Sequence, residues 1–346
     1  MKITVENLIT IYENALTSKP NNHLVYNRLA ELYYARGNFA AAFDVYQKAL
    51  QLQPEFQISN ENIKLHFLNF QNITKKESSE LYKWAILDIE LVSNDLDSID
   101  LLYMSDLDGI LIKNVFSTKE IETAREHIES LSSEFEPVIY GESLGLSIME
   151  AKNDLKEYFQ KAYNFRLQLN QIFADEFETR IFDVFNNLHS LKNIKLLDRK
   201  NHDICIPAQI RIVYPGKGGL KAHTDNEVFE KYQVYKHFNE IQKDVDILSY
   251  FIVIDKPEKG GELVLYDLLR EQTTLSMKQD FYSCQRDNFL DNLRKQYINP
   301  DIGDMVIFNG GRIWHKVADF DGDKNRITVG GFLLSSQDNQ TIYCVT

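Results

Sequence analysis

The sequence predicts an α+β protein, in which a double-stranded β-helix (jelly roll) with buttressing helices is preceded by a small all-α domain. Two observations predict this architecture. From Arg211 onward, short β-prone segments alternate with turns that contain glycine or proline, a pattern typical of β-sandwiches and barrels. The first ninety residues instead carry aromatic and small residues at the spacing of paired helices. The chain therefore divides into a helical and a β-rich region.

The helical region is typical of tetratricopeptide repeats. Residues 23–54 fit one helix pair of this repeat, and residues 5–18 fit the second helix of a preceding repeat. A tyrosine, an alanine and a proline recur thirty-four residues apart, which is the length of one repeat. The marker residues are Tyr12, Ala15 and Pro20 in the first repeat, and Tyr26, Leu29, Ala30, Tyr33, Gly37, Ala42, Tyr46, Ala49 and Pro54 in the second. Residues 57–92 are expected to continue as helices, so this tetratricopeptide-like domain spans residues 1–92.

The polar and acidic stretch that begins at Ser93 predicts a linker over residues 93–104, followed by the jelly-roll domain over residues 105–346. Repeat helices of this type usually bind peptides or partner proteins in a concave groove. Because fewer than three repeats are seldom stable alone, these helices could instead brace the second domain or form a dimer contact. Both roles stay open on the sequence.

Two histidines and one aspartate form a candidate metal site. His223 and Asp225 stand two residues apart, and on a strand both side chains would point to one face while Thr224 points away. His315 follows later in the chain as the third candidate. Two imidazoles and one carboxylate make the facial triad of non-heme Fe(II) oxygenases, which leaves coordination positions open. A structural zinc site would instead use four protein ligands.

A candidate anion site lies on the strand expected after the third candidate ligand. The alternating segment 325–332 places Arg326 and Thr328 on one face, where a guanidinium fork and a hydroxyl suit a buried carboxylate. Lys324, two residues before Arg326, is the alternative cation. Tyr214 stands on a preceding strand before a Pro-Gly turn, and its phenol is expected to donate to the same carboxylate.

Local patterns predict the remaining elements. Apolar, β-prone runs next to glycine- or proline-bearing turns predict further strands. These strands lie at residues 247–253, 262–266 and 305–308. Helical apolar spacing predicts helices that would buttress one face of the jelly roll, and Ser117 with Glu120 forms a capping-box pair that would begin the first of them. These helices lie at residues 117–131, 154–165 and 168–188.

Two inserts, at residues 227–243 and 269–297, carry aromatic residues among charges. The aromatic residues could close over a substrate as lids, or they could belong to the core, which is the more common role of an aromatic stripe at helical spacing. They are Phe229, Tyr232, Tyr235, Phe238, Phe281 and Tyr282. Asn309 and Trp314 pose a similar choice, between lining the site and serving as a turn residue and a core aromatic.

Taken in order, the motifs resemble those of the Fe(II)/2-oxoglutarate dioxygenases of the prolyl-4-hydroxylase-like branch. The resemblance covers about residues 105–336. The ordered motifs are Tyr214, His223-Thr224-Asp225, Gly260-Gly261-Glu262, Gly303-Asp304, His315 and Arg326-Ile327-Thr328. Within this family the chain is most similar to the cyanobacterial indole-alkaloid halogenases. Those enzymes replace the carboxylate ligand with glycine so that chloride can bind, whereas this chain keeps Asp225.

The resemblance implies an enzyme that uses Fe(II), 2-oxoglutarate and dioxygen, and that releases succinate and CO2. The implied iron ligands and catalytic residues are His223, Asp225 and His315, and the implied contacts of the distal 2-oxoglutarate carboxylate are Arg326, Thr328 and Tyr214. Because the carboxylate ligand is kept, the expected reaction is hydroxylation of an unactivated C–H bond. By resemblance to natural-product tailoring members, the expected substrate is a small metabolite or a free or tethered amino acid. The alternatives are a protein or peptide hydroxylase whose repeats recruit the polypeptide, and a non-enzymatic partner-binding protein.

The composition limits the class of protein further. The net charge of −13 argues against nonspecific binding to DNA or RNA phosphate. Three cysteines, Cys205, Cys284 and Cys344, lack Cys-x-x-Cys spacing and fit unpaired thiols in a reducing cytosol. No apolar signal segment and no run of transmembrane length is found, so a cytoplasmic protein without a membrane partner is expected.

Overall fold

The computed structural model divides the chain into two compact units, Met1–Lys76 and Glu77–Thr346, and each unit is described by itself. The structure describes residues 5–35, 39–53, 81–92, 98–138, 141–149, 155–189, 192–199, 203–217, 221–232, 238, 241–242, 245–273 and 290–346.

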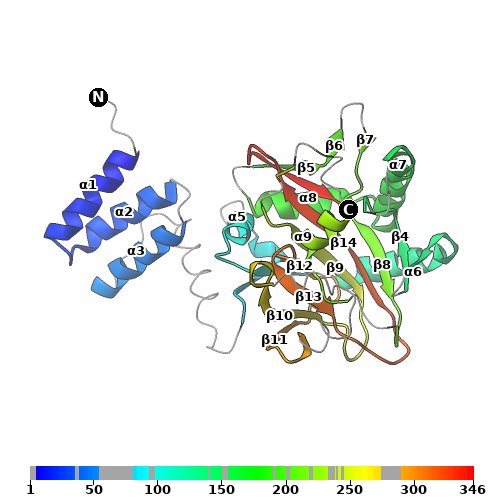
Figure 1. Ribbon diagram of the computed structural model, residues 1–346. Coiled ribbons are helices and arrows are strands. Elements are labelled where there is room, and N and C mark those ends of the chain that lie inside the picture. Colours follow the sequence, from blue (N-terminus) through cyan, green and yellow to red (C-terminus); the bar gives the residue numbers. More distant parts are fainter. Residues whose placement is uncertain are drawn as a thin grey trace. The chain divides into compact units, whose positions relative to one another are not determined.

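Helices make up the described part of the first unit, as the repeat pattern predicts (Figure 1). They are α1 (Val5–Ser18), α2 (His23–Ala35) and α3 (Phe39–Leu52). Helix α2 packs against both neighbours, and the buried contacts use the marker residues Ala30, Ala42, Tyr46 and Ala49. The three alanines are small enough to let the helices approach closely, and Tyr46 is fully buried beside them. The helix predicted at residues 5–18 is confirmed, whereas Gly37 and Pro54 lie outside the described residues.

The boundary between the two regions differs from the expected one. A helix is expected up to residue 92, but Trp84–Asp88 forms strand β1, which pairs in parallel with β2 (Gly109–Lys113). Periodicity alone cannot assign so short an apolar run to a helix or a strand. The expected linker also contains helix α5 (Ser98–Tyr103), which is partly buried. Residues 81–92 and 98–104 therefore belong to the second unit, and residues 57–80 and 93–97 lie outside the described residues.

Two β-sheets form the centre of the second unit. The main sheet has the strand order β1-β2-β12-β9-β14-β8-β4-β3, and β15 joins β14 and β5 beside this path. These strands are β12 (Met305–Phe308), β9 (Leu248–Asp255), β14 (Arg326–Ser335), β8 (Gln209–Val213), β4 (Gly141–Leu144), β3 (Glu136–Val138), β15 (Thr341–Val345) and β5 (Asn193–Leu196). The smaller sheet has the order β11-β10-β13, with β11 (Lys295–Ile298), β10 (Leu263–Leu269) and β13 (Ile313–Val317). A separate pair joins β6 (Asp198–Arg199) and β7 (Asp203–Ile204).

The inner face of the main sheet packs on the smaller sheet. Side chains of β12, including Val306 and Phe308, share one buried cluster with Leu263 and Leu265 of β10. The opposite face packs on helices, since Tyr250 of β9 meets Phe185 edge to face with ring centroids 5.0 Å apart. Two facing sheets, mainly antiparallel, with helices on the outer face of one of them, confirm the predicted jelly roll.

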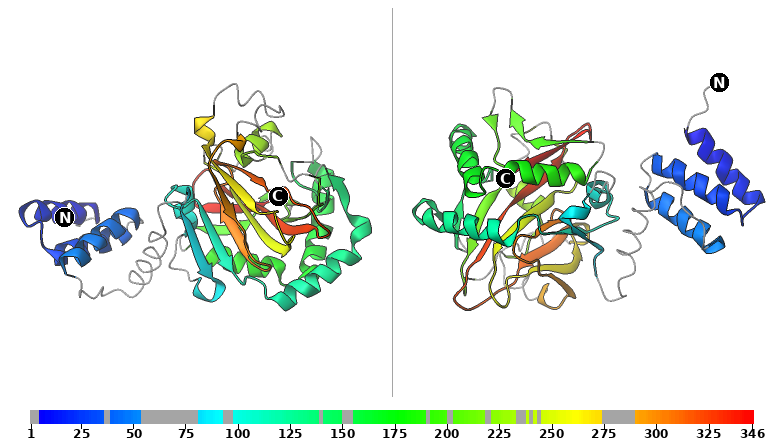
Figure 2. Two further views of the ribbon diagram at one scale, coloured as in Figure 1. Left: turned by 90° about the horizontal axis from the view of Figure 1, so that it is seen from below. Right: turned by 180° about the vertical axis from the view of Figure 1, so that it is seen from behind.

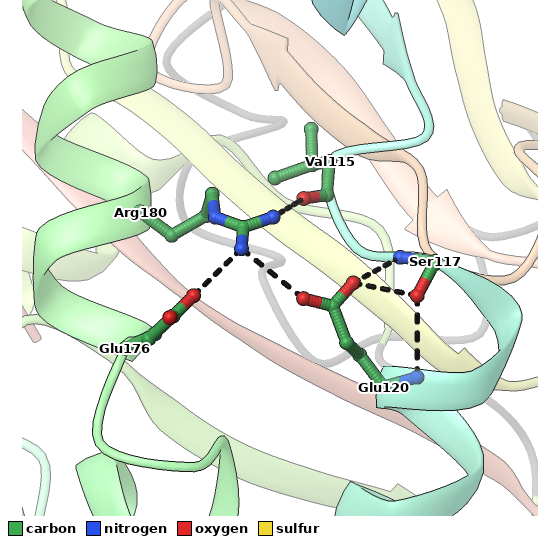
Figure 3. A network of polar contacts seen from close by, with 5 residues as sticks. All are labelled: Val115, Ser117, Glu120, Glu176 and Arg180. Carbon is green, nitrogen blue, oxygen red and sulfur yellow. Dashed lines mark hydrogen bonds and ion pairs between the residues drawn. The ribbon is translucent and has the colours of Figure 1, made fainter.

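The buttressing helices are α6 (Thr118–Ser130), α7 (Leu155–Ile172) and α8 (Phe177–Asn187), which Figure 2 shows together on one side of the main sheet. The predicted capping box at the start of α6 is confirmed. Figure 3 shows how Arg180 of α8 contacts this cap. Arg180 donates to the carbonyl of Val115 and forms ion pairs with Glu120 and Glu176. The break between α7 and α8 lies at residues 173–176 rather than at 166–167, and Ala174 and Asp175 adopt φ of 55° and 65° there.

The aromatic residues of the first insert belong mainly to the core. Helix α9 (Asp225–Lys231) buries Phe229, whose ring meets Phe332 of β14 at 5.0 Å. Phe238 is also fully buried, whereas Tyr232 is exposed. The lid interpretation is therefore wrong for Phe229 and Phe238. Tyr235, Phe281 and Tyr282 lie outside the described residues.

Short 3-10 turns complete the fold at Ile89–Leu91, Ser132–Glu134 and Arg270–Gln272. Cys205 and Cys344 are buried and are not joined in a disulfide bond, and Cys284 lies outside the described residues. In the part of the chain that the structure describes, no helix is both long and apolar enough to cross a membrane.

Candidate metal centre

A short backbone bridge brings His223 and His315 side by side. The amide of each residue donates to the carbonyl of the other at 3.0 Å, so the segment around His223 lies against strand β13. Asp225 does not continue this bridge as a strand residue, in contrast to the expectation. Thr224 is extended and stands at the N-cap position of α9 without a capping hydrogen bond from its side chain. Asp225 is the first residue of α9, and its amide donates to the carbonyl of Gly310 at 2.8 Å. The turn into the helix brings the carboxylate back toward the imidazoles.

The three candidate ligands converge on one point. Their nearest ligand atoms all lie within 4.8 Å of one another, and all three residues are buried. The Asp225 carboxylate lies 3.4 Å from Nε2 of His223 and 3.8 Å from Nε2 of His315. The imidazole centroids are 4.4 Å apart, and the rings are inclined by 53°. This is the set of donors that the facial triad requires, and three protein donors do not complete the coordination of a metal ion.

Hydrogen bonds to the backbone orient both imidazoles. Nδ1 of His223 lies 2.7 Å from the carbonyl of Lys221, and Nδ1 of His315 lies 2.9 Å from the carbonyl of Ile313. A carbonyl can only accept, so each Nδ1 carries the proton and each Nε2 presents its lone pair. This second contact is typical of histidines that bind metals, because it sets both the tautomer and the ring orientation.

Asp225 is held as an anion in a buried position. Burial raises the pKa of its carboxyl, but the imidazoles of His315 and His223 and a hydrogen bond from Ser249 outweigh this effect and bring the pKa to about 2. Burial and the neighbouring His223 lower the pKa of His315 to about 4, so its ring is neutral at pH 7. The donor set is therefore one carboxylate and two imidazole nitrogens, which fits Fe(II).

Gly310 makes room for this arrangement. A Cβ at Gly310 would lie 2.2 Å from Oδ2 of Asp225 and 2.1 Å from Oγ of Ser249. Both distances are far below a van der Waals contact, so any side chain would displace the carboxylate. Ser249 and Gly310 were not foreseen from the sequence, because both act through Asp225 from distant parts of the chain.

Arg326 and Thr328 form the second part of the site. They stand on the same face of β14, and Nη1 of Arg326 lies 3.4 Å from Oγ1 of Thr328. Nε of Arg326 donates to the carbonyl of Gly261 at 2.8 Å, and the guanidinium lies 5.3 Å from the centroid of Phe251. Arg326 is buried, whereas the alternative cation Lys324 is exposed. No acidic partner of Arg326 is found among the described residues, so its charge is free to meet a bound anion.

Tyr214 is not brought to these residues. Its neighbour Val213 pairs with Arg326, and residues 211 and 213 share the face of Arg326 and Thr328. Tyr214 follows on the opposite face, where burial and a hydrogen bond with Glu142 of β4 raise the pKa of its phenol to about 12. The expectation that Tyr214 donates to the same carboxylate is therefore corrected.

Asn309 and Trp314 take their structural roles. Nδ2 of Asn309 lies 3.4 Å from the carbonyl of Leu102, and its Oδ1 accepts from the amide of Arg312, which closes the turn before β13. Trp314 is fully buried in a hydrophobic cluster with Val264 and Tyr266 of β10. The ring therefore points away from the neighbouring ligand His315, as strand alternation requires.

Comparison with family models identifies the fold unit around this site. The model of the carrier-protein-independent halogenase WelO5 matches residues 81–346, which is most of the chain. The chain belongs to the WelO5 family. A tetratricopeptide repeat model matches residues 23–56, in agreement with helices α2 and α3. The WelO5 match begins at residue 81, shortly before β1 and close to the start of the second unit at Glu77. No curated protein matches the chain at a significant level.

Solved structures of oxygenases resemble the WelO5-family unit only distantly. An N-substituted L-amino acid dioxygenase from Burkholderia ambifaria AMMD, in complex with alpha-KG, is 14% identical, with 71% of this chain and 90% of that chain covered and a TM-score of 0.46. The carbocyclase SnoK from nogalamycin biosynthesis is 14% identical, with 67% and 81% covered and a TM-score of 0.38. A Pseudomonas putida prolyl-4-hydroxylase is 13% identical, with 65% and 91% covered and a TM-score of 0.30. These similarities are too low to assign a family, and the assignment to the WelO5 family depends on the family model alone.

Membership of the WelO5 family makes this protein an enzyme of the Fe(II)/2-oxoglutarate-dependent class. Its cofactors are Fe(II) and 2-oxoglutarate, with dioxygen as cosubstrate, and the converging His, Asp and His side chains agree with this requirement. The chain carries a carboxylate side chain, Asp225, beside the two imidazoles of this cluster.

Proposed function

We propose that the protein is a hydroxylase that acts on an unactivated C–H bond of a small metabolite or of a free or tethered amino acid. The observation that carries this proposal is the buried carboxylate side chain of Asp225 beside the two imidazoles. The halogenases that this chain resembles carry glycine instead of the carboxylate ligand, so that a halide can bind to the metal there. Here Asp225 fills that position, which favours oxygen transfer.

We assign the iron to Nε2 of His223, Nε2 of His315 and the carboxylate of Asp225. When bound, the iron with 2-oxoglutarate and dioxygen supplies the oxidation, in which one oxygen atom enters the substrate C–H bond and the other enters succinate with release of CO2. The protein contributes orientation, because backbone carbonyls hold both rings and Ser249 holds the carboxylate.

We assign the distal carboxylate of 2-oxoglutarate to Arg326 and Thr328. The guanidinium is buried without an acidic partner among the described residues, and the nearby hydroxyl of Thr328 offers a second donor. A buried guanidinium is costly unless a bound anion compensates it. A planar fork also matches the two oxygens of a carboxylate better than a lysine would.

The tetratricopeptide-like unit supports a second candidate, a polypeptide hydroxylase that recruits its substrate through the repeat helices. Incubation with a tryptic peptide mixture would test this candidate. Peptides that gain one oxygen atom only in the presence of 2-oxoglutarate would favour the polypeptide over the small metabolite.

The first test of the proposed function is the anaerobic addition of Fe(II) and then 2-oxoglutarate to the metal-free protein. We expect a weak visible charge-transfer band that requires both additions, and its absence in the variant His223→Ala, while circular dichroism shows that the variant is folded. No band from the folded wild-type protein would contradict the proposal.

A further inference from the structure

Arg211 and Arg326 lie on the same inner face of the main sheet. In the antiparallel pair of β8 and β14, Arg211 stands directly opposite Thr328, and Arg326 stands two residues along from Thr328. Directly paired residues share a face of the sheet, and so do residues two apart on one strand. This face also carries Ser249 and Phe251 of β9, which contact Asp225 and Arg326, so it is the face that bears the site.

Neither guanidinium has an acidic partner among the described residues. Nε of Arg211 donates to Oε1 of Gln209 at 3.2 Å, and Arg326 donates to the carbonyl of Gly261 and to Thr328. Burial, and to a lesser degree the nearby charge of Arg211, lower the pKa of Arg326 to about 10. Two cations held on one face of a sheet, one of them buried, favour the binding of anions.

The cosubstrate can compensate only one of these charges. In the proposed function, the distal carboxylate of 2-oxoglutarate meets Arg326, and the other end of the molecule faces the metal. Arg211 is then left for another bound molecule. Arg211 is also the more exposed of the two, because Arg326 is 7% exposed whereas Arg211 is only partly buried. Arg211 is therefore more accessible to a molecule that binds after 2-oxoglutarate.

The neighbours of Arg211 hold it in a fixed orientation. Gln209 is buried and donates to the carbonyl of Gly145 at 2.7 Å, so its Oε1 faces Nε of Arg211. On the other side, Ser143 of β4 stands opposite Arg211 in the register and is also buried. With Nε engaged by Gln209, the two terminal nitrogens remain for a ligand. Their planar geometry matches the two oxygens of one carboxylate.

We propose that Arg211 binds a carboxylate of the substrate, and that the enzyme therefore acts on a carboxylic acid. This inference rests on the proposed function, because the substrate must lie beside the site that holds 2-oxoglutarate. It narrows the substrate class from any small metabolite to molecules that carry an anionic carboxylate within reach of the inner face of β8.

The test uses the full-length protein loaded with Zn(II) in place of Fe(II) and saturated with 2-oxoglutarate, so that no turnover occurs and the Arg326 site is filled. The probes are matched pairs of carboxylic acids and their primary amides: 3-phenylpropanoate, N-acetyl-leucine and N-acetyl-tryptophan with the corresponding amides. Binding is measured by saturation-transfer NMR and then by titration. We expect at least one acid to bind about tenfold or more tightly than its amide, as a charge-assisted contact implies.

Three variants decide the assignment. Arg211→Gln should remove the preference for the acid and leave the affinity for 2-oxoglutarate within about twofold of the wild type. Arg211→Lys should retain part of the preference, because it keeps the charge but loses the fork. Arg326→Gln should weaken 2-oxoglutarate binding instead. Thermal unfolding of each loaded variant checks that it is folded.

The outcomes separate this inference from the proposed function. Equal binding of acids and amides, or no binding of any acid, by a protein that shows the Fe(II)–2-oxoglutarate band overturns the role of Arg211 alone. An Arg211→Gln variant that loses 2-oxoglutarate affinity as strongly as Arg326→Gln also overturns it, because Arg211 would then belong to the cosubstrate site. Absence of the band overturns the proposed function itself.

Discussion

Ser249 of β9 donates a hydrogen bond to Oδ2 of Asp225, although the two residues lie in different elements, a strand of the main sheet and the start of α9. Oδ1 of the same carboxylate lies 3.4 Å from Nε2 of His223. One oxygen is thus held by the sheet while the other faces the candidate metal position. This hydrogen bond directs the Asp225 carboxylate toward the imidazoles, although Asp225 begins a short helix and is not part of a strand.

We expect Ser249→Ala to weaken Fe(II) binding by about 10- to 100-fold, the range found when the hydrogen-bonding partner of a metal ligand is removed. The physical reason is that the Asp225 carboxylate loses the donor that orients it. Competition with a chelator of known affinity measures the change. Ser143→Ala is a matched control, because Ser143 is a buried serine on the same sheet that does not contact Asp225. Equal Fe(II) affinity in wild type and Ser249→Ala would contradict the positioning role.

We expect Asp225→Gly to reduce 2-oxoglutarate-dependent succinate formation at least about tenfold, because the site loses the one carboxylate among the candidate ligands of the described residues. The substitution also opens the position that a halide occupies in the family's halogenases, so products with and without chloride should be compared by mass spectrometry. Asp246→Asn changes a neighbouring acid that contacts Asn226 and serves as the control. Succinate formation at the wild-type rate in Asp225→Gly would remove Asp225 from the ligand set.

We expect Arg326→Gln to raise the KM for 2-oxoglutarate by about 10- to 100-fold, since a charge-assisted contact with the distal carboxylate is lost. Lys324→Gln should leave this KM unchanged, because the Lys324 side chain is exposed and lies outside the buried site. Succinate release at varied 2-oxoglutarate concentration measures both values. The opposite result, with Lys324→Gln alone raising KM, would transfer the role to Lys324.

We expect Tyr214→Phe to change the KM for 2-oxoglutarate by less than about twofold, as is usual for residues away from a site. The phenol faces Glu142 on the other side of β8 and does not share the face of Arg326. The same succinate assay checks this expectation. A tenfold rise in KM would restore Tyr214 to the cosubstrate site and would show that our assignment of its face is wrong.

The elements that were predicted correctly are those whose sequence pattern lies within one short segment of the chain. The alternation after His315, the capping box of Ser117 and Glu120, and the repeat register of residues 5–18 each depend on neighbours in the chain, and each is confirmed. The converging ligands were also foreseen, because their residue types and order are distinctive of a family. The same reasoning placed Asp225 on a strand, whereas the chain turns into α9 at that residue.

The features that sequence reasoning missed depend on contacts between distant segments. Arg211 and Ser249 gain their roles only through the register of β8, β14 and β9, which the sequence does not specify. Tyr214 was misassigned because proximity along the chain was given more weight than strand alternation. Alternation places Tyr214 on the other face of the sheet from Arg211. Strand β1 was missed because a buried strand of five residues has no period that distinguishes it from a helix.

The core role of Phe229 gives a last prediction, on stability. Its ring is fully buried against Phe332 and lies on the helix that begins with Asp225. We expect Phe229→Ala to lower the free energy of unfolding of the second unit by about 3–5 kcal/mol, because the substitution leaves a cavity in a closely packed core. Tyr232→Ala, one turn further on, removes an exposed ring and should change stability by less than about 0.5 kcal/mol. Urea unfolding of the metal-free protein measures both. If Phe229→Ala leaves stability unchanged but lowers turnover, the ring acts as a lid over the site and does not support the core.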